Sequence, residues 1–183
     1  MREPATIIAI DAATTSGIAV LVPGQPEGGI CLYSPALYGF VKGASTEVIS
    51  EVLRDIIERV WSPDIRVVIE YPYLGKNPHS TLICCAVTTR WETVAQLLGM
   101  RADLVPANTW QTQQLGRGGS GKREQRKKLA QSLVSGAMGI RCNQDEADAL
   151  CLAIWSLQCE TSETGILCRI DSSIPARAVH VRW

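Results

Sequence analysis

Apolar residues in the first forty positions gather in short runs that predict strands. Residues 6–11, Thr-Ile-Ile-Ala-Ile-Asp, have the pattern of a buried strand, and residues 17–22 follow after a turn of small residues. Two strands this close in sequence are expected to pair antiparallel. Turn-forming residues fill 23–29, and the β-branched and aromatic content of 30–40 predicts a third strand, interrupted at Pro35. The N-terminal third is therefore predicted to be a strand meander.

The remainder of the chain changes to a helical spacing that alternates with short apolar runs. Residues 45–61 place an apolar side chain every three or four positions between a Ser/Thr cap and Pro63, which predicts a helix. A polar, glycine-rich stretch occupies 116–121. The other predicted elements are a strand at 65–70, a helix at 79–98, a strand at 102–105, a basic helix at 122–138, an apolar helix at 144–157, and short strands at 166–170 and 179–183.

A meander followed by alternating helices and strands predicts an α/β fold. We expect a mixed sheet flanked by helices, in which the first and fourth strands lie parallel and adjacent. A chain of 183 residues is long enough for one such core and too short for two full domains. The expected division is a domain over residues 1–158 and a C-terminal tail over 159–183 whose structure the pattern does not define.

Composition excludes several other classes of protein. Eighteen basic residues balance eighteen acidic ones, and 46% of the residues are hydrophobic, which is typical of a folded globular protein. No apolar run approaches the ~18 residues of a membrane span, and no secretory signal pattern opens the chain, so we expect a cytoplasmic protein without a membrane partner. Seven cysteines without a C-x-x-C pair are expected to be reduced.

Two carboxylates stand where apolar strands end. Asp11 follows Ile-Ile-Ala-Ile and Glu70 follows Val-Val-Ile, so each is expected at the carboxyl edge of the sheet, where open α/β folds bind ligands. Either residue alone is equally explained as the first solvated position after a strand. If the two strands are neighbours, however, the two charges repel unless a cation neutralises them.

A second acidic group opens the apolar helix predicted at 144–157. Asn143 and Glu146 fit a capping box, and Asp145 in the first turn complements the helix dipole, so these three have a structural explanation. Asp148 does not, because it lies beyond the first turn among Ala, Leu and Cys. Its i to i+3 spacing places it on the same face as Asp145, which favours a shared cation.

Together these carboxylates suit a pair of divalent ions. All-oxygen ligation favours Mg²⁺, with Mn²⁺ able to substitute, and two such ions can hold the attacking and leaving oxygens of a phosphoryl transfer. The four candidate ligands are Asp11, Glu70, Asp145 and Asp148.

A basic segment follows the predicted strand at 102–105. Residues 117–128 hold six basic residues against one acidic residue, which indicates a polyanionic partner, although a solvated helix face beside a loop is the alternative. Residues 116–122 nearly match a nucleotide-binding P-loop. Arg123 replaces the required Ser or Thr, and no apolar strand precedes the segment, so ATP binding is disfavoured. Residues 11–15 resemble the phosphate loop of actin-like sugar kinases, which need two such domains and a longer chain.

Combined, these motifs resemble the RuvC family of Holliday-junction resolvases in the RNase H-like superfamily. The resemblance rests on the strand ending at Asp11, the segment from Ile69 to Asn77, Lys122, and Asn143-Gln-Asp-Glu-Ala-Asp-Ala-Leu150, and it spans residues 6–157 in order. It implies an RNase H-like fold and a homodimeric, metal-dependent endonuclease. Such an enzyme makes paired nicks in a four-way DNA junction and leaves 5′-phosphates. Departures from the family pattern favour a divergent or phage-encoded member.

Site residues carried over by this resemblance include the four acids as catalytic metal ligands and Lys122 as a catalytic basic residue near the scissile phosphate. Tyr73 falls where the family stacks an aromatic residue at the junction centre, with a packing tyrosine as the alternative. A second family lysine falls on Gln111, beside Trp110, and Arg117 is the alternative source of that charge. The expected DNA-binding residues are Tyr73, Lys76, Arg117, Lys122, Arg123, Arg126 and Lys127.

Two questions stay open at the level of sequence. The apolar side of the helix predicted at 79–98 is either the dimer interface or core, and its members are Leu82, Ile83, Val87 and Trp91. Other functions of the same fold are a nuclease acting on RNA–DNA hybrids, forks or flaps, and a non-catalytic module that binds nucleic acid or a small phosphate ligand. Neither a helicase partner nor a cleavage-site preference can be read from the residues.

Overall fold

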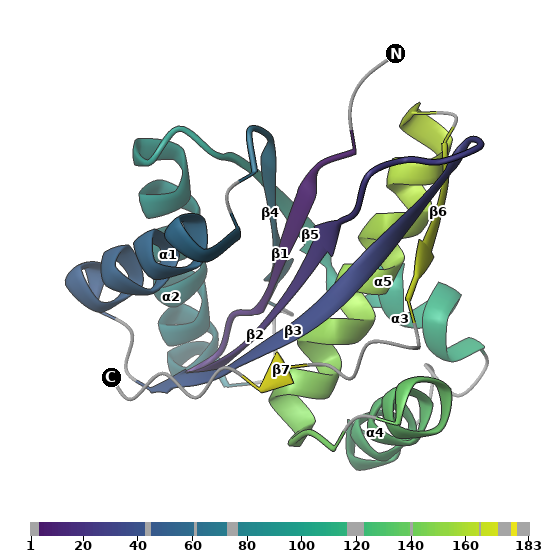
Figure 1. Ribbon diagram of the computed structural model, residues 1–183. Coiled ribbons are helices and arrows are strands. Elements are labelled where there is room, and N and C mark those ends of the chain that lie inside the picture. Colours follow the sequence, from purple (N-terminus) through teal and green to yellow (C-terminus); the bar gives the residue numbers. More distant parts are fainter. Residues whose placement is uncertain are drawn as a thin grey trace.

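The computed structural model describes residues 4–42, 45–60, 62–72, 77–116, 123–139, 141–164, 166–171 and 177–178. Its centre is a seven-stranded mixed sheet with helices on both faces (Figure 1), which confirms the predicted α/β class. The strands are β1 (Thr6–Asp11), β2 (Thr15–Pro23), β3 (Ile30–Lys42), β4 (Ile65–Tyr71), β5 (Arg101–Pro106), β6 (Leu167–Ile170) and β7 (Arg177–Ala178).

Strand order follows the predicted plan of a meander extended by parallel strands. The order is β5-β4-β1-β2-β3-β6, and β7 pairs with β3. β1, β2 and β3 pair antiparallel, whereas β4 lies parallel to both β1 and β5. The expected adjacency of the first and fourth strands is therefore confirmed.

β3 runs through Pro35 without the interruption expected from the sequence. Pro35 stays in register with Leu21 of β2. On the other edge of β3, β6 pairs with residues 30–33 and β7 with residues 36–37, so Pro35 falls between the two pairing segments. A proline is tolerated there because no ladder on that edge needs its missing N–H group.

The helices form one layer on each face of the sheet. α1 (Thr46–Val60) and α2 (Pro78–Leu97) cover one face, and α3 (Ala107–Leu115), α4 (Arg123–Met138) and α5 (Gln144–Thr164) lie on the other (Figure 1). Alternation along β1 serves both layers: Ile8 and Ile10 pack toward α1 and α2, whereas Ile7 and Ala9 pack toward α5. α3 was not predicted, because 107–115 carries no apolar stripe.

Residues beyond 158 contribute to the same sheet. The boundary expected at 158 falls inside α5, which continues to Thr164. β6 then pairs parallel with β3, and its Cys168 and Ile170 pack against the core on the α5 face. The strand expected over 179–183 lies outside the described residues.

The predicted dimer face of α2 is divided between core and surface. Trp91 is fully buried and donates a hydrogen bond from Nε1 to the hydroxyl of Ser16, and Val87 is also buried. Leu82 is 68% exposed and Ile83 is 37% exposed. Only the N-terminal part of this face is therefore free to contact another molecule.

Within the described residues, no helix combines the length and apolar character needed to span a membrane.

Candidate active site

Two parallel strands deliver Asp11 and Glu70 to one edge of the sheet. β1 and β4 are in register up to Ile10 and Ile69, so the residue that follows on each strand is an acid. Side chains alternate along a strand. Asp11 therefore shares the face of Ala9, and Glu70 shares the face of Val68, both of which pack on the α5 side. The predicted meeting of these two carboxylates at the carboxyl edge is confirmed.

The start of α5 brings the second acidic pair to the same edge. Asn143 and Glu146 cap each other, with Glu146 N donating to Asn143 Oδ1 at 2.9 Å and Asn143 N to Glu146 Oε2 at 2.8 Å. The predicted capping box is confirmed, and Glu146 is occupied with this cap. Asp145 and Asp148 lie one turn apart, and Asp148 is only 8% exposed. A buried carboxylate in an apolar helix needs a positive partner nearby.

Close packing sets the position of α5 over the sheet. A Cβ added to Gly17 of β2 would overlap the backbone carbonyl of Asp145 and approach the backbone nitrogen of Glu146. Glycine is therefore required at this point for the strand and the helix start to touch. This contact fixes the depth at which Asp145 and Asp148 stand above β1.

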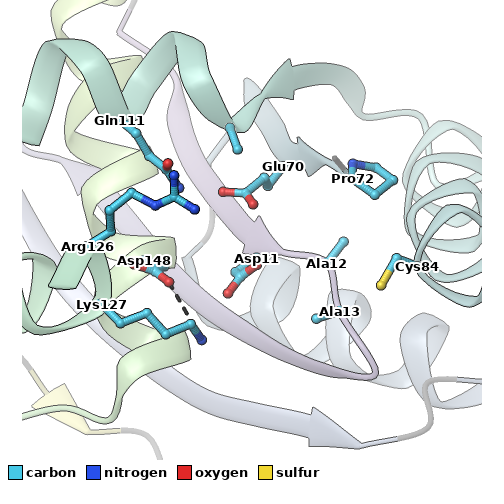
Figure 2. A pocket seen from close by; sticks show the side chains of 11 residues that line it. Asp11, Ala12, Ala13, Glu70, Pro72, Cys84, Gln111, Arg126, Lys127 and Asp148 are labelled. Atoms are coloured by element: carbon cyan, nitrogen blue, oxygen red, sulfur yellow. Dashed lines mark ion pairs between the residues drawn. The ribbon is translucent and has the colours of Figure 1, made fainter. Parts of the chain in front are cut away.

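A pocket of about 310 Å³ opens where these elements meet. Figure 2 shows carboxylates and cations facing one another across it, with the acids supplied by β1, β4 and α5 and the two basic side chains by α4. The charged and amide side chains that line it are Asp11, Glu70, Asp148, Arg126, Lys127 and Gln111.

Trp110 on α3 holds the Glu70 carboxylate. Its indole Nε1 donates to Glu70 Oε2 at 2.8 Å, and the Trp110 side chain is fully buried. The same helix places Gln111 at the pocket wall. Trp110 was not among the residues predicted to belong to the site. The available signal was a tryptophan just after a strand that runs beside the one ending in Glu70.

Burial and repulsion by neighbouring carboxylates make Asp11 and Glu70 difficult to ionise. The pKa of Asp11 is raised well above its usual range, first by burial and then by the charges of Glu70 and Asp148. The pKa of Glu70 rises from 4.5 to about 7, chiefly through burial, although the Trp110 hydrogen bond acts in the opposite direction. A cation bound at this edge of the sheet would favour the ionised form of both carboxylates.

Stability should depend on pH through Glu70. Its folded-state pKa lies above the unfolded value, so the folded chain binds more protons, and this stabilisation disappears as pH rises from 4.5 to about 7. Glu70→Gln cannot ionise. Between pH 5 and 8, in EDTA, we expect the variant to lose about 2 kcal/mol less unfolding free energy than the wild type. Urea unfolding measures this difference, and equal losses would contradict the assigned burial of Glu70.

Two of the predicted DNA-binding residues enter the pocket. Lys127 Nζ lies 2.6 Å from Asp145 Oδ1 and 3.8 Å from Asp148 Oδ2. Arg126 also points into the pocket (Figure 2), and its charge lowers the pKa of Glu70. Both cations are therefore directed toward the carboxylates, and their contact with DNA stays a prediction.

The other predicted basic and aromatic residues are not placed by the described part of the chain. Tyr73, Lys76, Arg117 and Lys122 lie outside the described residues. Arg123 is the first residue of α4, and only its backbone is described. The roles assigned to these five residues stay predictions.

The chemistry of the carboxylate group fits a hard divalent cation. Asp11, Glu70, Asp145 and Asp148 offer only oxygen donors, as Mg²⁺ and Mn²⁺ prefer. The pKa of Asp11 is raised first by burial and then by the neighbouring carboxylates, whose repulsion a cation would relieve. As they stand, no three Asp, Glu, His or Cys side chains of the described ranges converge closely enough to coordinate an ion. The positive charge next to Asp145 and Asp148 is that of the Lys127 ammonium, which pairs with both carboxylates.

Comparison with solved structures identifies the fold, whereas comparison of sequences finds no relative. No protein-family model and no curated protein sequence matches the chain. Thermus thermophilus RuvC matches with a TM-score of 0.60 at 16% identity, covering 88% of this chain and 97% of that one, and so does its complex with a Holliday junction substrate. The yeast mitochondrial Holliday junction resolvase Ydc2 gives a TM-score of 0.49 at 11% identity, covering 90% and 83%. The chain therefore has the fold of T. thermophilus RuvC.

Proposed function

We propose that this protein is a metal-dependent endonuclease that resolves four-way DNA junctions by paired nicks leaving 5′-phosphates. The observation that carries the proposal is the meeting of Asp11, Glu70 and Asp148 in one pocket of a RuvC-like fold, with Asp145 one turn from Asp148. Arg126 and Lys127 supply positive charge at the same pocket, as a phosphate substrate requires. Holliday junction substrate is also what the T. thermophilus RuvC complex contains.

The four acids would hold Mg²⁺, or Mn²⁺ in its place, with two ions per site. When bound, such ions supply charge for the phosphate oxygens and acidify a water molecule. The chain contributes the geometry. β1 and β4 fix Asp11 and Glu70 side by side, Trp110 holds one oxygen of Glu70, and α5 presents Asp148 from the opposite wall. Arg126 points into the same pocket (Figure 2), where it would offset charge on the scissile phosphate.

Trp110 acts in this proposal as a positioning residue for Glu70. Trp110→Phe keeps an aromatic ring in the core but removes the donor to Glu70 Oε2. The Glu70 carboxylate, a proposed metal ligand, is then no longer held in one orientation. We therefore expect kcat for junction cleavage to fall about 10- to 100-fold with little change in KM. Steady-state rates over a range of junction concentrations measure both constants. A loss confined to KM would show that Trp110 has another role.

A homodimer would present two such sites to two strands. The exposed Leu82 and Ile83 near the start of α2 are the part of the predicted interface that remains accessible, so we place the second copy there. We expect the wild type to sediment as a dimer at micromolar concentration and Leu82→Lys to sediment as a monomer. A wild-type monomer would remove the two-site arrangement.

The substrate of the site is tested by comparing how the same protein cleaves different nucleic acids. Labelled four-way junction, duplex, fork, flap and RNA–DNA hybrid are each incubated with the protein and Mg²⁺. Preferential cleavage of the junction supports the proposal. Preference for the hybrid, fork or flap would assign the site to another RNase H-like nuclease, and binding without any cleavage would indicate a non-catalytic module.

A further inference from the structure

We propose that Lys127 is a built-in cation of the acidic site, which holds the Asp145–Asp148 side together and which a divalent ion must displace in order to bind there. The inference rests on the proposed function, because it concerns the same carboxylates. It assigns to Lys127 a role other than DNA contact. A divalent ion that binds beside Asp145 and Asp148 would have to compete with the Lys127 ammonium for their oxygens.

The geometry places the ammonium between the two acids of α5. Lys127 Nζ lies 2.6 Å from Asp145 Oδ1 and 3.8 Å from Asp148 Oδ2. Figure 2 shows the Lys127 side chain reaching toward Asp148, with their ion pair drawn as a dashed line. Both partners are on one helix, so a single lysine connects α4 to the start of α5.

Burial distinguishes these contacts from an ordinary surface ion pair. The side chains of Lys127, Asp145 and Asp148 are 17%, 29% and 10% exposed. Solvent screens such a group much less than a surface pair, so the charge of Lys127 is committed to the cluster. α4 also packs on α5, which keeps the lysine stem in place.

Competition follows from which oxygens the ammonium uses. A divalent ion on this side needs Asp145 and Asp148 oxygens at about 2.0–2.1 Å. Asp145 Oδ1 already accepts a hydrogen bond from the ammonium, which also forms an ion pair with Asp148 Oδ2 at 3.8 Å. Two cations cannot share so small a space without strong repulsion. The ion therefore binds at this side only when Lys127 has left it.

Metal binding without DNA tests the proposal. Mn²⁺ affinity is measured by paramagnetic resonance of free Mn²⁺ for the wild type, for Lys127→Met, and for the control Lys128→Met. Lys128 is the exposed neighbour on α4, so its variant removes the same charge from the same helix. We expect Lys127→Met to bind Mn²⁺ about tenfold more tightly than the other two. Lys127→Arg, which keeps a cation, should not gain affinity.

Stability of the metal-free protein gives a second readout. In EDTA, Lys127→Met should melt at a lower temperature than Lys128→Met, since it leaves Asp145 and Asp148 without the ammonium, and Mn²⁺ should restore the loss. If Lys127→Met is unfolded in EDTA, refolding on addition of Mn²⁺ supports the proposal, and failure to refold overturns it.

The outcomes separate this inference from the proposed function. Equal Mn²⁺ affinity in all the proteins would overturn the role of Lys127 and leave the metal-dependent nuclease intact. If neither the wild type nor Lys127→Met binds Mn²⁺ at millimolar concentration, both the inference and the metal site fail.

Discussion

Asp148→Asn is expected to reduce junction cleavage on the order of 10³-fold while junction binding is retained. The substitution keeps the shape of a side chain that is only 8% exposed and that lines the pocket opposite Asp11 and Glu70. It removes the charge that would hold a divalent ion. Asp148 is not part of the N-terminal cap of α5, which Asn143 and Glu146 form, so asparagine at this position should preserve the fold. Single-turnover cleavage and a binding isotherm in Ca²⁺ separate the two effects.

Glu146→Gln is the matched control for Asp148. Glu146 lies two residues earlier on α5 and accepts a hydrogen bond from the backbone nitrogen of Asn143 at 2.8 Å. A glutamine oxygen can accept the same bond, so the cap remains and the helix loses one negative charge, as in Asp148→Asn. Cleavage by this variant should stay at the wild-type level. Equal losses in both variants would mean that the charge of the helix start, not Asp148 itself, is required.

Gly17→Ala is expected to destabilise the fold by about 2–3 kcal/mol. The new Cβ would overlap the backbone carbonyl of Asp145, and neither backbone can move aside without separating β2 from the start of α5. Because that contact also sets the depth of Asp145 and Asp148, cleavage should fall in the fraction that remains folded. Chemical denaturation measures the first effect, and cleavage at a temperature well below the transition measures the second.

Gly136→Ala provides the opposite expectation at a second glycine. A Cβ at Gly136, inside α4, meets nothing within 4 Å. Alanine in a helix interior is favoured over glycine, so this variant should be more stable by about 0.5–1 kcal/mol. If Gly17→Ala and Gly136→Ala behaved alike, the close approach of β2 and α5 would not be the cause.

The acidic site could be predicted from sequence because the repeat of strands and helices determines which way each acid points. Asp11 and Glu70 each follow a buried strand, and once β1 and β4 are parallel neighbours the two-residue alternation decides which face both acids take. Asp148 was recognisable as a carboxylate that a helix cap does not explain. In each case a local pattern and one topological expectation were sufficient.

α3 and the direction of Lys127 could not be predicted in the same way. Residues 107–115 mix Thr, Trp and Gln without an apolar stripe, and the position of α3 follows from tertiary contacts such as the hydrogen bond between Gln114 and Gln158 of α5. Lys127 belongs to a run of basic residues whose members are equivalent in sequence. Only the packing of α4 on α5 decides which lysine reaches Asp145 and which remains in solvent.

Mapping the cleavage of a four-way junction, in Mg²⁺ and in EDTA, tests the central claim most directly. The junction carries a label on each strand in turn, so that every nick is assigned to a strand and a position. We predict nicks at symmetrically related positions in two opposite strands, with 5′-phosphate ends, in Mg²⁺ alone. Junction binding without cleavage in either Mg²⁺ or Mn²⁺, or equal cleavage in EDTA, would contradict the assignment of this carboxylate site to junction resolution.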